Sequence, residues 1–253
     1  MGVSFVFWTN RLKNYVAFKK YRLDKVKDPE NLIDRLEKIF NEDNLLDKPY
    51  SSTSFIFLTQ KSTLVPSEFF DESKIKDFFE FNQTLDDLDE LNYNYIPAID
   101  AYNIFAIPNY IANHVYDKFR NIKFYHQATP FIQSLVNGFE EQNGVHINLN
   151  HDFFDIGVIE NSALKFYNTF KFLNDTDLLY FIMFVVNQLK IDIQSSLFTV
   201  CGESVDKPVL IEALNKYLPN LSYLEPVYPD FSDIFKKLSC HKYFNLFYLA
   251  NCE

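Results

Sequence analysis

The stretch Phe154–Phe170, FDIGVIENSALKFYNTF, contains the residues of this chain that are best suited to phosphate chemistry. Asp155 and Gly157 are separated by one residue, and apolar, strand-like segments flank them. Alternation along a strand places these two residues on the same side. If that side lined a cleft, Asp155 could hold Mg²⁺ through water, and Gly157 could let a phosphate approach the backbone. The pattern is therefore one hypothesis for a nucleotide site.

The same pair has a structural interpretation, which the following residues favour. In this interpretation Asp155 is a hydrogen-bonded polar residue, and Gly157 relieves crowding or marks a bulge. A turn that holds phosphate offers successive free N–H groups and small side chains. Here the chain continues with Val158, Ile159 and Glu160, and the last would add negative charge beside a polyphosphate. Asp155 is thus the one candidate catalytic residue, and we prefer the structural interpretation for it.

Two histidines and a cysteine supply other candidates for chemistry. His146 and His151 lie close in sequence to Asp152, which is a combination that could suggest a metal site. Alternation along an unbroken strand puts the two histidines on opposite faces, so we expect no metal site. Cys201 follows the strand-like segment SSLFTV, where a cysteine is more often buried and inert than nucleophilic. The sequence has no G-x-S-x-G, P-loop or H-E-x-x-H motif.

Composition and charge exclude several classes of protein. The chain has 253 residues, of which 47% are hydrophobic, and this content is typical of a folded protein with one large core or two smaller ones. Its net charge of −10 argues against nucleic-acid binding, and we interpret the one basic run, Lys19 to Arg22, as the solvated face of a strand. The longest apolar run, Leu178 to Val186, is too short to span a membrane.

The cysteines and the start of the chain indicate a compartment. Three cysteines without C-x-x-C spacing leave one unpaired in any disulfide scheme, which fits a reducing environment. The first residues form a strand-like run and do not have the pattern of a signal peptide. We therefore expect a cytoplasmic protein that is not embedded in a membrane.

Periodicity along the chain predicts strands that alternate with helices. The expected strands are 3–8, 14–23, 53–60, 102–108, 122–127, 145–150, 151–160, 163–172, 195–200 and 221–226. The expected helices are 28–43, 67–79, 109–120, 129–142, 174–190 and 205–218. We interpret the acidic stretch 85–91 as a surface connection, and we expect the apolar tail from His241 to pack onto the body of the protein.

Polar residues at the predicted helix starts suggest their caps. Asp28, followed by Pro29, is expected to cap the first helix, and Ser67 the second. The helix over 174–190 is apolar on nearly every face, so we expect it to be buried. The candidate caps of the last two helices are Asn174, Asp175 or Thr176, and Ser204 or Asp206.

The order of these segments resembles the actin-like ATPase clan, which includes sugar kinases and heat-shock ATPases. The D-x-G stretch, the following helix and LFTVCGESVDKPVLIEALNKYL resemble the second half of that fold. YNIFAIPNYIANHVYDKF with IKFYHQATPFIQSLV resembles pilus-assembly relatives of actin. The resemblance is closer still to an uncharacterised bacterial family, domain of unknown function 3822, through STLVPSEFF, AYNIFAIP, LKFYNTFKF, DLLYFIMFVVNQL and FNLFYLANCE.

This resemblance covers nearly the whole chain and implies a fold. It implies an α/β protein with a two-subdomain actin-like ATPase (ribonuclease H-like) architecture, in which helices flank mixed sheets. The expected subdomains are residues 1–130 and 131–253, with no flexible linker between them.

The resemblance also implies nucleotide-binding residues. In the clan a D-x-G hairpin holds phosphate, and a later Gly-Gly turn holds the adenosine. The matching positions here are Asp155, Gly157 and Gly202, with ATP and Mg²⁺ as the implied cofactors. This chain departs from the pattern at two places, since Glu203 stands where a second glycine is usual, and the first hairpin turn, FWTNRLKN, has no Gly or Asp.

Four charged residues outside these motifs are further candidates for the site. Arg11 or Lys13 in the first hairpin turn could contact phosphate, although a solvated turn residue is the preferred interpretation of each. Asp24 and Asp100 carry no recognisable motif.

The retained fold pattern and the eroded phosphate loops together suggest a function. We expect a non-catalytic binding or scaffolding protein with a degenerate nucleotide cleft, acting on an unknown protein partner. One alternative is an active or slow Mg-dependent ATPase in which Asp155 orients the metal. Another is an adaptor for a membrane or secretion assembly.

Overall fold

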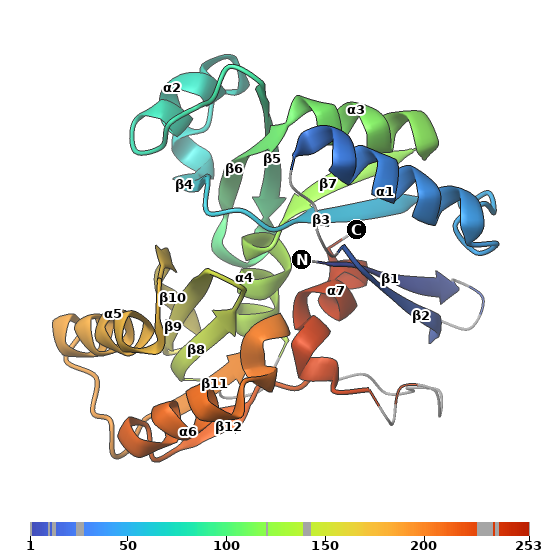
Figure 1. Ribbon diagram of the computed structural model, residues 1–253. Coiled ribbons are helices and arrows are strands. Elements are labelled where there is room, and N and C mark those ends of the chain that lie inside the picture. The colour runs from blue at the N-terminus through green and yellow to red at the C-terminus, as the bar shows by residue number, and fades with distance from the viewer. Residues whose placement is uncertain are drawn as a thin grey trace. The chain divides into compact units, whose positions relative to one another are not determined.

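The structure is a computed structural model that describes residues 2–9, 11, 14–23, 28–119, 121–138, 143–226, 235 and 238–252. The chain forms two compact units, which we call unit 1 and unit 2 (Figure 1). Unit 1 comprises Met1–Tyr95 and Ala101–Gln127, and unit 2 comprises Ile96–Asp100 and Ala128–Glu253. The main boundary between the two units lies between residues 127 and 128.

Among its described residues, unit 1 forms a hairpin, two further small sheets and three α-helices. The hairpin pairs β1 (Gly2–Thr9) with β2 (Asn14–Arg22) in antiparallel orientation. The parallel pair is β3 (Thr53–Phe57) and β7 (Ile122–His126). The third sheet has the order β4 (Ser62–Pro66), β6 (Ala101–Pro108), β5 (Asp89–Ile96). The helices are α1 (Pro29–Glu42), α2 (Ile75–Glu80) and α3 (Asn109–Lys118).

Helix α1 begins and packs as its sequence predicts. The carboxylate of Asp28 accepts a hydrogen bond from the backbone N–H of Asn31 at 2.8 Å, so Asp28 is the N-cap. The buried residues Leu36 and Phe40 of this helix pack against Phe7 of the hairpin. This contact fixes α1 against the hairpin and forms one core of unit 1.

Two predictions in the segment before β6 are wrong. The stretch 85–91 is not a surface connection throughout, because β5 begins at Asp89. Asp86 and Asp89 both bind the ammonium of Lys61, at 2.6 and 2.7 Å, and this neutralises part of the acidic run. The sequence did not predict β5 because asparagine, which occurs twice in it, is disfavoured in strands.

The start of α2 also differs from its prediction. Pro66 ends β4 as expected, but Ser67 makes no capping hydrogen bond. Asp71 is the capping residue of the turn before α2, since its carboxylate accepts from the N–H of Ser73 at 3.0 Å. The helix is therefore shorter than expected and covers only Ile75–Glu80.

Unit 2 is built on one five-stranded sheet with the order β10-β9-β8-β11-β12. Its strands are β8 (Gly144–Leu149), β9 (Phe153–Glu160), β10 (Ala163–Lys171), β11 (Leu197–Cys201) and β12 (Leu221–Tyr223). Its helices are α4 (Ala128–Asn137), α5 (Asp175–Gln188), α6 (Pro208–Tyr217) and α7 (Phe244–Tyr248). The antiparallel meander β8–β9–β10 is confirmed, and β11 is parallel to β8 and to β12.

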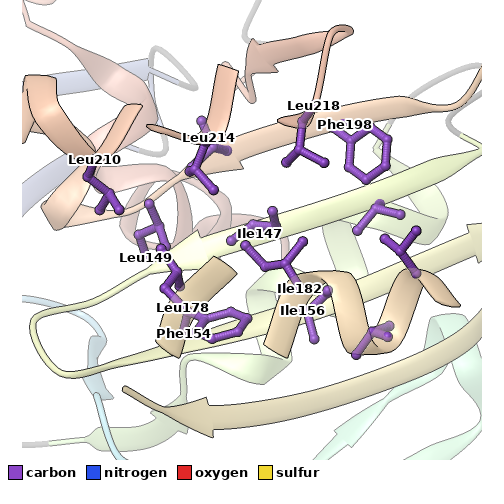
Figure 2. Packing of buried hydrophobic residues seen from close by; sticks show 14 of the residues in the cluster. Ile147, Leu149, Phe154, Ile156, Leu178, Ile182, Phe198, Leu210, Leu214 and Leu218 are labelled. Carbon is purple, nitrogen blue, oxygen red and sulfur yellow. The ribbon is translucent and has the colours of Figure 1, made fainter. Parts of the chain in front are cut away.

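One face of this sheet is apolar and is covered by α5 and α6. Figure 2 shows Ile147 and Ile156 of the sheet beside Ile182 of α5, and Phe198 beside Leu218. Helix α5 is capped by Asn174, whose side chain accepts from the N–H groups of Thr176 and Asp177. The expectation that α5 is buried all round is wrong, because Tyr180 and Phe184 are 62% and 45% exposed.

The other face of the sheet is covered by α4 and α7, and we call it the α4 face. Phe131 and Leu135 of α4 pack there with Phe244 and Tyr248 of α7, so the apolar tail packs onto the body of unit 2 as predicted. At α6 neither expected cap is used, because Lys207 precedes the helix and makes no side-chain capping bond. Pro208 at the first position has no N–H that would need a partner.

Candidate functional site

Asp155 and Gly157 lie inside β9 and not in a hairpin turn. The turn that follows β9 is formed by Asn161 and Ser162, whose φ angles of 54° and 60° are both positive. Positive φ at both central residues is typical of a two-residue type I′ turn. Asp155 and Gly157 therefore lie within the strand and on one face of it, as alternation predicts.

The Asp155 carboxylate is fully buried and accepts three side-chain hydrogen bonds. Its Oδ2 accepts from Nδ2 of Asn148 at 2.8 Å. Its Oδ1 accepts from the hydroxyl of Tyr167 at 2.8 Å and from the hydroxyl of Thr169 at 2.7 Å. Both carboxylate oxygens are thus engaged by groups from β8 and β10 within unit 2.

These partners come from the strand register. Thr169 and Asn148 lie directly opposite Asp155 on the two neighbouring strands, and Cys201 lies opposite Asn148 on the next strand. The Sγ of Cys201 is 3.7 Å from Oδ1 of Asn148. A row of polar side chains therefore crosses four strands on the α4 face, and we call it the polar row.

Sequence reasoning did not include Asn148, Tyr167 or Thr169 in the candidate site. A signal was present, because the three strands were expected to form a meander. In a meander, each residue of β9 faces one residue on either side. The pairing could not be read without knowing the turn lengths, since a shift of one residue reverses the faces.

Gly157 is covered by helix α4. A Cβ atom at this position would lie 2.8 Å from Cδ1 of Leu135 and 3.5 Å from Cε1 of Phe131. The absence of a side chain therefore lets α4 approach the sheet at this position. Opposite Gly157 on β8 is His146, which is fully buried, with Nδ1 at 2.8 Å from Oγ1 of Thr199.

Gly202 occupies a backbone conformation that favours glycine, with φ of 100°. A Cβ atom there would lie 2.3 Å from the carbonyl oxygen of Leu149 and 2.7 Å from Oδ1 of Asn148. Its N–H donates to the carbonyl of His241 at 2.9 Å. The turn after β11 thus packs closely against the end of β8, while Glu203 is exposed.

Burial controls the ionisation of the groups around the polar row. It raises the pKa of the Tyr167 hydroxyl well above 10.0, and the nearby Asp155 carboxylate adds to this effect. Burial likewise raises the pKa of the Cys201 thiol well above 9.0, with further contributions from Asp155 and Glu225. Cys201 is therefore a neutral thiol at neutral pH, which does not suit a nucleophile.

The remaining candidate residues do not join this network. His151 is exposed in the turn between β8 and β9, away from the buried His146. Asp100 follows a short turn in a left-handed conformation with φ of 46°, and Arg11 is exposed. Lys13 and Asp24 lie outside the described residues.

The described part of the chain offers neither a metal-binding cluster nor a membrane-spanning helix. Among these residues, no group of three or more His, Cys, Asp or Glu side chains could hold a metal ion. No helix over the same ranges is long and apolar enough to cross a membrane.

Comparison with known proteins identifies the fold. Residues 1–221 match the family described as Protein of unknown function (DUF3822). A protein of Bacteroides thetaiotaomicron VPI-5482, described as having an actin-like ATPase fold and unknown function, superposes with a TM-score of 0.84 at 20% identity. The match covers 100% of this chain and 92% of that one. No curated protein matches the chain.

A second solved structure is similar over almost the whole length. A chain of the PilM–PilN type IV pilus biogenesis complex superposes with a TM-score of 0.59 at 12% identity. The match covers 99% of this chain and 95% of that one. At these identities the two likenesses show the fold alone.

Proposed function

The chain belongs to the DUF3822 family of proteins of unknown function and has the actin-like ATPase fold, and from this premise we propose that it is a non-catalytic binding or scaffolding protein. Its nucleotide site is degenerate in this proposal. The partner is another protein, and the protein acts in the cytoplasm.

The observation that carries the proposal is the engagement of the three candidate residues within unit 2. The Asp155 carboxylate has three hydrogen-bond donors around it, and Leu135 of α4 covers Gly157. The backbone at Gly202 packs against Leu149. A catalytic Asp needs a free oxygen for a metal-bound water, and a phosphate loop needs free N–H groups. In this proposal all three residues stabilise unit 2, and none of them holds a metal-bound water or a phosphate.

Calorimetry with Mg²⁺ and ATP, together with an assay of phosphate release, tests this proposal. We expect no turnover above the rate of the buffer, and at most weak binding. Turnover that disappears in Asp155→Asn, while the variant keeps the circular dichroism spectrum of the wild type, would overturn the proposal. Asp152→Asn is the matched control, because Asp152 is exposed in the preceding turn.

One observation favours the alternative of a slow Mg-dependent ATPase. The side chain of Asn150, in the turn between β8 and β9, is buried, and its Nδ2 has no hydrogen-bond partner among the residues described. A buried amide without a partner is a costly feature that a bound ligand could satisfy. In the same assays Asn150→Ala would reduce ATP binding in this alternative and would leave it unchanged in the leading proposal.

The partner in the proposal is a protein because of the second structural likeness. PilM is solved in complex with PilN in a type IV pilus biogenesis assembly. In the adaptor form of the proposal, the present chain likewise binds a protein of a membrane or secretion assembly. Affinity purification of the tagged full chain from its native cells, followed by mass spectrometry, identifies the partner. Recovery of the chain alone, from membrane and soluble fractions alike, contradicts this form.

A further inference from the structure

A hollow in unit 1 lies between the end of β2 and helix α1. It has a volume of about 390 Å³ and is lined by Tyr21, Arg22, Leu23, Arg35, Lys38, Ile39, Glu42 and Asp43. This volume falls within the range of ~300–1,000 Å³ that is usual for small-molecule sites. The lining comes entirely from unit 1, so the hollow is separate from the polar row of unit 2.

The acidic groups of the hollow are already paired. Asp43 accepts a hydrogen bond from the Tyr21 hydroxyl and lies 3.0 Å from Nζ of Lys19. The bond from Tyr21 is the main reason why the pKa of Asp43 is lowered to about 2, so the group is a carboxylate at neutral pH. Glu42 lies 3.8 Å from Nζ of Lys38. The negative charges of both residues are therefore compensated locally.

The two arginines of the hollow have no such compensation. Neither Arg22 nor Arg35 makes an ion pair or a side-chain hydrogen bond with any residue that the structure describes. The chain has a net charge of −10 and contains only four arginines, so two unpaired guanidinium groups beside one hollow are an unusual local excess of positive charge. Within the basic run Lys19 to Arg22, Lys20 and Arg22 are exposed, as expected for a solvated strand face.

We propose that this hollow binds a small molecule that carries a phosphate monoester beside an apolar group. Guanidinium groups form paired hydrogen bonds with phosphate oxygens, and two of them match a dianion in charge. Leu23 and Ile39 supply an apolar lining for the group that the phosphate is attached to. The site is independent of the proposed scaffolding function, which does not require it.

Calorimetric titration of the full chain with phenyl phosphate tests the site. Inorganic phosphate tests binding of the phosphate group without a ring. Benzoate tests binding of a ring that carries a single negative charge. We expect phenyl phosphate to bind most tightly, and Arg22→Gln and Arg35→Gln each to weaken its binding about tenfold or more. Arg35→Lys keeps the charge but loses the paired hydrogen bonds of a guanidinium group. Its affinity for phenyl phosphate should therefore lie between that of the Gln variants and that of the wild type.

Arg11→Gln is the matched control, because Arg11 is exposed in unit 1 and the substitution removes the same charge. It should leave the affinity for phenyl phosphate unchanged. Arg22 and Arg35 are also exposed, so their variants should keep the melting temperature of the wild type. Three results would each overturn the proposal: no binding to the wild type at millimolar concentration, equal binding to an Arg22→Gln/Arg35→Gln double variant, or equal weakening by Arg11→Gln.

Discussion

At the scale of single residues, Asp155 is defined by the groups that surround it. Its two oxygens accept from one amide and two hydroxyls in a position without solvent exposure. A donor that loses its acceptor inside a protein costs about 1–3 kcal/mol of stability. Three donors depend on this one carboxylate, so we expect its contribution to stability to be large.

Replacing Asp155 by Ala should therefore lower the free energy of unfolding by about 3 kcal/mol or more. Thr169→Val removes one of the three donors and leaves the carboxylate with the other two, so it should cost only about 1 kcal/mol. Urea unfolding followed by circular dichroism measures both. Equal stabilities of the two variants would contradict the central position of Asp155 in the polar row.

The sequence predicts this residue only in part. Alternation placed Asp155 and Gly157 on one face correctly, because period-two alternation is a local property of a strand. The donors come from β8 and β10, and their identity depends on the register between strands. The residues after Asp155 favoured a hydrogen-bonded carboxylate, but they could not name Asn148, Tyr167 or Thr169 as its partners.

At the scale of elements, two glycines have different reasons for having no side chain. Gly157 makes room for the tip of Leu135, which is a flexible side chain, whereas Gly202 faces the backbone carbonyl of Leu149 and has a positive φ. A leucine tip can shift by a few tenths of an ångström, but the end of β8 cannot do so without disturbing the sheet.

Gly202→Ala should consequently be the more damaging substitution. We expect it to lower the free energy of unfolding by more than about 2 kcal/mol, since both the left-handed conformation and the close approach oppose a Cβ atom. Gly157→Ala should cost about 1 kcal/mol, and Leu135→Ala in the same chain should recover part of that loss. A double-mutant cycle measures this coupling, and its absence would show that α4 does not limit the size of residue 157.

Elements with strong local signals were predictable, and elements that depend on context were not. The cap at Asp28 and the meander over residues 145–172 follow from residue types that act over a few positions. Strand β5 was missed because its two asparagines and Asp89 are of residue types that are disfavoured in strands, and in the structure Lys61 compensates Asp89 and the preceding Asp86. The exposure of Tyr180 and Phe184 was missed because the apolar residues of a helix do not reveal which of its faces another element covers.

At the scale of the whole molecule, both units contain ionisable groups whose pKa values are shifted by burial. Unit 1 contains His126, which is fully buried at the end of β7 with Nε2 at 2.9 Å from the carbonyl oxygen of Thr59. Burial lowers the pKa of this histidine to about 4, although the Thr59 carbonyl opposes the shift. Unit 2 contains Cys201 and Tyr167, whose pKa values are raised. Mild acid should therefore act on unit 1 through His126, whereas groups with raised pKa values occur in both units, such as Tyr21 in unit 1 and Cys201 in unit 2.

The sign of the acid effect follows from proton binding. The pKa of a histidine in the unfolded chain is about 6.5. Below this pH the unfolded state therefore binds a proton at residue 126, whereas the folded state does not until the pH approaches 4. The stabilisation from neutral His126 is present above pH 6.5 and is lost progressively as the pH falls towards about 4. The pKa of Asp43 in the folded state is about 2, so the stabilisation that this carboxylate provides is lost only below about pH 4.

Unit 1 should therefore lose about 2 kcal/mol of stability between pH 7 and pH 5, and His126→Gln should abolish most of this loss. The glutamine amide can still donate to the carbonyl of Thr59, so the variant separates the charge from the hydrogen bond. The chain has one tryptophan, Trp8, which lies in β1 of unit 1, so urea unfolding followed by its fluorescence reports on this unit. His151→Gln, at an exposed position of unit 2, should keep the pH dependence of the wild type. A Trp8 transition that shifts equally with pH in wild type and His126→Gln would assign the acid sensitivity to another group.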